Sequence, residues 1–64
     1  MQAEERIRKL IALGDSRSKQ GLTGKARESY AEALELAHKV GTDGSLGKLI
    51  ELRLADLDAR DSTG

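Results

Sequence analysis

The stretch that decides the fold is LIALGDSRSKQGLTGKARESYAEALEL, residues Leu10–Leu36. Two glycines, Gly21 and Gly24, stand near its centre, and small or apolar residues recur at intervals of three and four on either side of them. This spacing stacks side chains along one face of a helix, and no run in the chain alternates with the period of two that marks a half-buried strand. The stretch therefore predicts two amphipathic helices joined by a tight turn.

Turn signals locate the ends of the predicted helices. Gly21 suits the left-handed conformation that ends a helix, Thr23 carries a hydroxyl that can cap the next helix, and Gly41 is a stop signal. The polar run 42–45 predicts a loop, in which Ser45 is placed to cap a third helix. We therefore expect an all-α domain with helices over residues 3–20, 24–40 and 46–60, followed by a polar, frayed tail over residues 61–64.

Length and composition predict one small domain over residues 1–64. A domain of 64 residues buries only about 60% of the surface that its unfolded chain exposes, so marginal stability is expected. The chain has no cysteine and a single histidine, His38, which excludes disulfides and any zinc site made by this chain alone. Tyr30 is the only aromatic residue, so the core must consist mostly of aliphatic side chains. A partner surface would supply the burial that such a core lacks.

Charge is balanced overall but not along the chain. Eleven acidic and eleven basic residues give a net charge of zero, which argues against a nucleic-acid or membrane partner. Residues 1–27 nevertheless carry a net charge of +4, and the remainder carries −4. This asymmetry favours an antiparallel pair of copies or an acidic partner for the first helix, although two solvated helix faces give the same pattern. No apolar run of membrane-spanning length and no secretory signal is present, so we expect a cytoplasmic protein.

Seven residues of the opening stretch have a distinctive spacing: Leu10, Leu13, Gly14, Gly21, Ala26, Tyr30 and Ala33. The spacing resembles that of the tetratricopeptide repeat (TPR), a helix-turn-helix unit of about 34 residues. The resemblance implies that Gly14 and Ala26 let the two helices approach closely, and that Tyr30 and Ala33 fill the contact with the next repeat. Three positions depart from the family pattern, because Leu10, Arg17 and His38 stand where Trp, an aromatic residue and Pro are usual.

The third helix has an apolar arc that is wider than one neighbouring helix covers. One stripe consists of Leu46, Ile50, Leu54 and Leu57, and Leu49 and Leu52 lie outside it. A solenoid needs about three repeats to close its core, so one and a half repeats predict a further partner. We therefore expect a capping or dimerising helix that forms a homodimer through Leu46, Leu49, Ile50, Leu52 and Leu54.

No group of side chains predicts catalysis or cofactor binding. His38 stands near the end of the second helix, where a cation interacts favourably with the helix dipole. The serines lack a neighbouring histidine, and the aspartates Asp56, Asp58 and Asp61 do not converge as a calcium loop requires. The run GLTGK lacks the upstream glycine and the strand of a phosphate loop. We expect no enzyme, no cofactor and no metal.

These features together predict a noncatalytic protein–protein interaction module, an adaptor or docking domain that self-associates through its third helix. The first helix lines the groove in tetratricopeptide proteins, so the resemblance implies a face for a protein or peptide partner made of Arg8, Ile11, Asp15, Ser18 and Lys19. The family's clamp for a terminal carboxylate uses a lysine and an asparagine one turn apart. Ile11 and Asp15 stand at those two positions here, so the resemblance does not imply that clamp. The alternative is a small regulatory or inhibitory protein that binds an acidic surface through its basic first helix.

Overall fold

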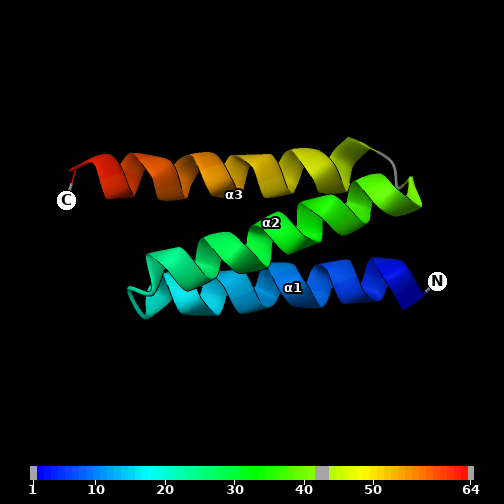
Figure 1. Cartoon of the computed structure of the whole chain (residues 1–64), viewed down its shortest axis with the longest axis horizontal. Coiled ribbons are helices and arrows are strands. Elements are labelled where there is room, and N and C mark those ends of the chain that lie inside the picture. The colour runs from blue at the N-terminus through cyan, green and yellow to red at the C-terminus, as the bar shows by residue number, and fades with distance from the viewer. Residues whose placement is uncertain (1, 42–43, 64) are drawn as a thin grey trace.

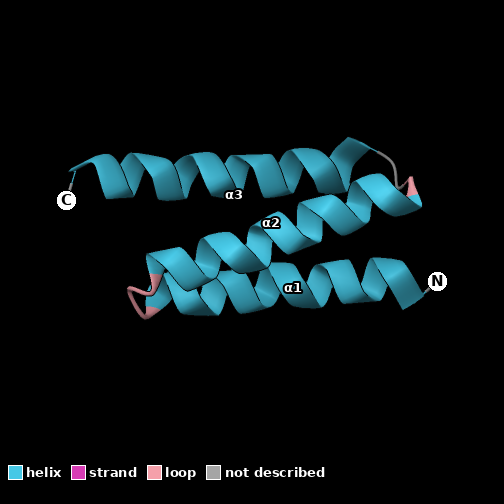
Figure 2. Cartoon of the chain, viewed as in Figure 1, coloured by secondary structure: helices cyan, strands magenta, loops and turns pink. Residues whose placement is uncertain are grey.

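The computed structural model describes residues 2–41 and 44–63 of the chain. These ranges form three helices, α1 (Gln2–Lys19), α2 (Thr23–Val40) and α3 (Gly44–Thr63), and contain no strand (Figure 2). The expected all-α fold is confirmed. None of these helices combines the length and the apolar character that crossing a membrane requires.

The three helices form a thin, elongated layer of 37 × 18 × 13 Å, with α2 between α1 and α3 (Figure 1). α1 and α3 run in the same direction and α2 runs in the opposite one. α2 packs against both of its neighbours, whereas α1 and α3 meet mainly through polar side chains. The thickness is close to the diameter of one helix, about 10–12 Å.

The core lies along the two sides of α2. Its buried members are Ile7, Ile11, Ala26, Tyr30, Ala33, Ala37, Ile50 and Leu57. The three alanines all come from α2, and their small side chains allow close approach of the neighbouring helices. Leu10, Leu34, Leu36, Leu46, Leu49 and Leu54 are half-buried and pack around this cluster.

Gly14 is the interior helix glycine that the packing requires. A Cβ atom at this position would lie 2.6 Å from Cε1 of the Tyr30 ring, closer than non-bonded carbon atoms approach one another. The ring of Tyr30 therefore lies directly on the backbone of α1. The close approach expected at Gly14 is present, and Tyr30 fills the α1–α2 contact in addition to facing α3.

The α1–α2 turn explains why Thr23 does not cap α2 as predicted. Gly21 has the expected left-handed conformation, with φ of 81°, and the amides of Gly21 and Leu22 donate to the carbonyls of Ser18 and Arg17. This is the Schellman arrangement at a helix end. Leu22 then occupies the N-cap of α2 with no side-chain cap hydrogen bond, so Thr23 lies inside the helix.

The ends of α3 also differ from the prediction. α3 begins at Gly44, so Ser45 lies inside its first turn rather than at the N-cap. Residues 61–63, expected to fray, continue the helix, while residues 42–43 of the expected loop and residue 64 of the expected tail lie outside the described residues. Gly41 ends α2 as expected, with φ of 67° and its amide donating to the Ala37 carbonyl.

Candidate functional site: a groove between α1 and α3

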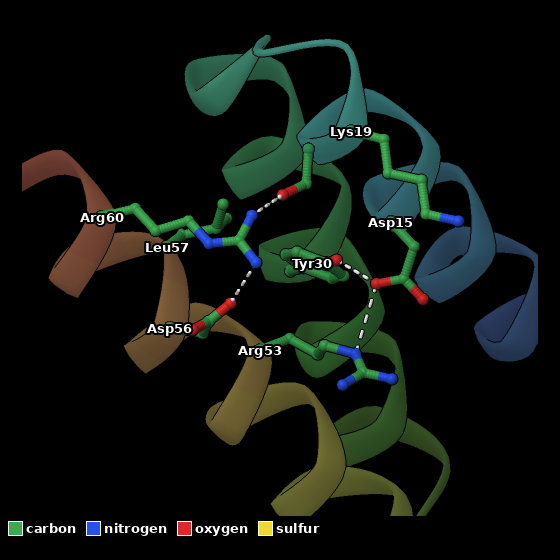
Figure 3. Close-up of a pocket in the computed structure, with 8 residues that line it drawn as sticks. Asp15, Lys19, Tyr30, Arg53, Asp56, Leu57 and Arg60 are labelled. Carbon is green, nitrogen blue, oxygen red and sulfur yellow. Dashed lines mark hydrogen bonds and ion pairs between the residues drawn. The ribbon is translucent and has the colours of Figure 1, made fainter.

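A polar groove of about 350 Å³ lies between α1 and α3, with Tyr30 of α2 between them (Figure 3). We call it the α1–α3 groove. The residues that line it are Asp15, Ser18, Lys19, Tyr30, Arg53, Asp56, Leu57 and Arg60. The groove exists because α2 separates α1 from α3, so the long side chains of the outer helices extend over α2 towards one another.

Tyr30 and Asp15 form the centre of the groove. Only 2% of Tyr30 is exposed, and its hydroxyl donates to Oδ1 of Asp15. Arg53 Nε lies 3.2 Å from the same oxygen. Burial, followed by the hydrogen bond to the Asp15 carboxylate and that charge, raises the pKa of Tyr30 to about 12, although Arg53 and Arg60 act in the opposite direction. Tyr30 therefore stays protonated at neutral pH, and one carboxylate links all three helices.

Arg60 makes the second link across the groove. Its Nη1 donates to Oγ of Ser18 at 3.0 Å, and its Nη2 lies 3.0 Å from Oδ2 of Asp56 one turn earlier on α3. Lys19 also lines the groove but has no ion-pair partner among the described residues. The groove thus carries three cations and two carboxylates, and Lys19 is the one of these charges that has no ion pair within residues 2–41 and 44–63.

The structure brings together three of the five residues predicted to bind a partner. Asp15, Ser18 and Lys19 line the groove. Ile11 does not, because it is only 7% exposed and belongs to the core. Arg8 does not either, since it is exposed and its Nη2 lies 3.3 Å from Oε1 of Glu4. Ile11 is therefore corrected to a core residue, whereas partner binding by Arg8 stays a prediction.

Sequence reasoning missed the half of the groove that α3 supplies. Arg53, Asp56 and Arg60 are spaced at three and four residues, which places them on one face of α3 beside its buried stripe. That spacing was a usable signal.

Most of the residues predicted for self-association are used inside the protomer. Ile50 is 0% exposed, and Leu46, Leu49 and Leu54 are half-buried against the core. Leu52 differs from them, with 67% exposed. α2 therefore covers most of the wide apolar arc of α3, and Ile50 is corrected to a core residue that a second copy cannot reach.

Ser29 and His38, which the sequence offers as candidates for catalysis, do not line the α1–α3 groove. Ser29 is buried, accepts a hydrogen bond from Arg17 Nη1 at 3.3 Å and donates to the Lys25 carbonyl at 3.2 Å. His38 is exposed near the end of α2. Among the described residues, no three His, Cys, Asp or Glu side chains are grouped as a metal site.

No protein-family model, curated protein or solved structure matches this chain. The resemblance to the tetratricopeptide repeat therefore stays a prediction based on the spacing of seven residues.

Proposed function

We propose that this chain is a noncatalytic protein–protein interaction module that binds a segment of another protein in the α1–α3 groove. One observation supports this best: polar side chains from two helices that are not neighbours in the layer converge on one open hollow over Tyr30. Open grooves between helices are common sites for peptide segments. The proposed role is that of an adaptor or docking domain.

The charges of the groove suggest what a bound segment offers. Arg53 is tied to Asp15 through Nε, and Arg60 is tied to Ser18 and Asp56. Lys19 has no counter-ion in the described part of the chain, so an acidic side chain on the partner would pair with it. An ion pair at the groove rim contributes mainly to orientation and association rate.

The regulatory alternative, in which the basic first helix binds an acidic surface, has weaker support. Arg8 pairs with Glu4 at 3.3 Å and Lys9 approaches Glu5 at 4.0 Å, both one turn apart on α1. These acids compensate much of the positive charge that the alternative requires. Self-association through α3 likewise has one well-exposed leucine to support it, Leu52.

A peptide-library selection tests the proposed groove. A phage-displayed random peptide library is panned against the full chain, and selected peptides are titrated while the fluorescence of Tyr30, the only aromatic residue, is followed. We expect the emission to change on binding, and amide NMR signals of Asp15, Lys19 and Arg53 to shift.

Two matched charge reversals at lysines test where the peptide binds. Lys19→Glu should weaken binding about tenfold, whereas Lys25→Glu, an equal change at an exposed position outside the groove, should not. Peptides that bind both variants equally, or that shift signals away from the groove, would contradict the proposal.

A further inference from the structure

A second surface lies on the α1–α2 hairpin, away from the residues that line the α1–α3 groove. Two adjoining hollows of about 230 and 590 Å³ share Glu32 and Glu35 as lining residues. We call this surface the α1–α2 seam and define it by Leu10, Leu13, Leu36, Glu28, Glu32 and Glu35. None of these residues lines the α1–α3 groove.

The middle of the seam is apolar. Leu13 is 41% exposed and does not belong to the core cluster, and Leu10 and Leu36 are half-buried beside it. The α1–α2 hairpin supplies most of the buried side chains of the core, and it also exposes this apolar strip on its surface. A surface that adds a second layer of helices would cover this strip.

The two edges of the seam carry opposite charges. Arg6 and Arg17 line its α1 side, and Glu28, Glu32 and Glu35 line its α2 side. These three glutamates are exposed and have no ion-pair partner among the described residues, although Lys39 lies at one end of the seam. Like charges three and four residues apart on a helix repel one another. A partner that brings cations to α2 and acids to α1 relieves this repulsion.

We propose that the seam binds a second copy of this chain. A twofold rotation about an axis along the seam places α1 of each copy over α2 of the other, antiparallel, which makes a four-helix arrangement. Arg17 of each copy then meets the acidic edge of the other on both sides of the axis, whereas Arg6 lies near the level of Lys39. The surface is complementary to itself at Arg17 and the glutamates, so a second copy satisfies both of these charges.

Contacts within the hairpin give the register of this pair. Arg17 Nη1 lies 3.3 Å from Ser29 Oγ, and Leu10 and Leu36 line the same hollow, so these residues share a level along the two helices. A rotation about an axis parallel to the helices keeps those levels. Arg17 of one copy therefore faces Glu28 of the other, and the apolar strips meet at the centre.

The area of the seam determines how strongly two copies are expected to associate. Two helices of 18 residues, each about 27 Å long and about 9 Å apart, offer a footprint on the order of 500 Å² per copy. A standard stable interface buries about 800 Å² per partner. We expect a weak dimer that forms at high protein concentration and does not depend on occupancy of the α1–α3 groove.

Two matched leucine variants of the full chain distinguish the seam from α3. Sedimentation velocity from micromolar to millimolar concentration measures the dimer, and circular dichroism checks that each variant stays helical. Leu13→Glu should shift the monomer–dimer midpoint to at least about tenfold higher concentration. Leu52→Glu places the same charge on the exposed edge of α3 and should leave the midpoint unchanged.

A charge-reversal pair tests the twofold geometry directly. Arg17→Glu alone and Glu28→Arg alone should each weaken the homodimer about tenfold or more, because each creates two like-charge contacts. An equimolar mixture of the two variants should restore the dimer as a heterodimer, in which both contacts again join opposite charges.

Three results would each overturn the inference. One is a wild-type chain that stays monomeric at every concentration tested. Another is a dimer that Leu52→Glu abolishes and Leu13→Glu does not, which would assign the second copy to α3. The third is a mixture of the two charge variants that stays as weakly associated as either variant alone.

Discussion

The two halves of the molecule are held together by different means. In the α1–α2 half, alanines and Gly14 bring the backbones close, and the ring of Tyr30 lies directly on α1. In the α2–α3 half, Ile50 and Leu57 provide the burial, while exposed ion pairs such as Arg27 with Asp58, at 2.6 Å, lie at the rim. The first half depends on a close backbone approach beside large buried side chains such as Ile7 and Tyr30, and the second depends on Ile50 and Leu57 with a polar rim. Substitutions should therefore act differently in the two halves.

The largest expected effect concerns the α2–α3 half. Ile50→Ala removes a side chain with 0% exposure, so the free energy of unfolding should fall by about 2–5 kcal/mol. Leu52→Ala, two residues away but 67% exposed, should change it by about 0.5 kcal/mol or less. Urea unfolding followed by circular dichroism measures both. Equal losses in the two variants would mean that α2 does not cover α3 as described.

Alkaline pH tests the contact that joins both halves. The pKa of Tyr30 is raised from 10.0 to about 12 in the folded chain, so its contribution is fully present below pH 10 and is lost as the pH rises towards 12. The loss approaches about 2–3 kcal/mol, at 1.4 kcal/mol per unit of pKa. Because Tyr30 is the only tyrosine, tyrosinate absorbance follows its ionisation alone.

Tyr30→Phe provides the control for this pH dependence. The variant keeps the ring on Gly14 but cannot ionise or donate to Asp15. Its unfolding free energy between pH 10 and 12 should therefore lack the pH dependence that Tyr30 contributes. An identical pH profile in both proteins, or an ionisation midpoint near 10, would contradict the described environment of Tyr30.

Matched glycine substitutions in the two halves should change the free energy of unfolding in opposite directions. Gly14→Ala places a Cβ 2.6 Å from the buried ring of Tyr30, and the overpacking should outweigh the gain of about 1 kcal/mol in helix propensity. We expect a net loss of up to about 2 kcal/mol. Gly47→Ala in α3 meets no atom within 4 Å and should stabilise by about 0.5–1 kcal/mol. Thermal or urea unfolding gives both signs, and a stabilising Gly14→Ala would remove the steric account of the first half.

The smallest effect is expected at the rim of the second half. Arg27 and Asp58 are 40% and 69% exposed, so solvent screens their ion pair. Asp58→Asn should cost about 0.2–1 kcal/mol at low salt and less at high salt. A larger loss that persists in high salt would mean that this charge, rather than Ile50 and Leu57, holds α3 in place.

The helices themselves could be predicted from the sequence, because their signals are local. Apolar spacing of three and four located α1, α2 and α3 to within a few residues, and Gly21 and Gly41 marked the two turns. The interior Gly14 also predicted close packing, since an unfavourable helix residue requires a reason. The N-caps were predicted less well, because the Schellman turn at Leu22 leads directly into α2.

Only the tertiary structure shows which helix packs against each apolar face. Periodicity shows that Ile50 lies on an apolar stripe. It does not show that α2 packs against this stripe, buries Ile50 and half-buries Leu49 and Leu54. Nor does it show that Asp15 meets Arg53 from a helix 38 positions along the chain. A periodic pattern fixes directions around one helix axis, whereas contacts depend on how separate axes are placed. The sequence therefore determined the helices, the turn glycines and the need for a close approach at Gly14. The α1–α3 groove and the exposed Leu52 depend on the placement of α3 against α2.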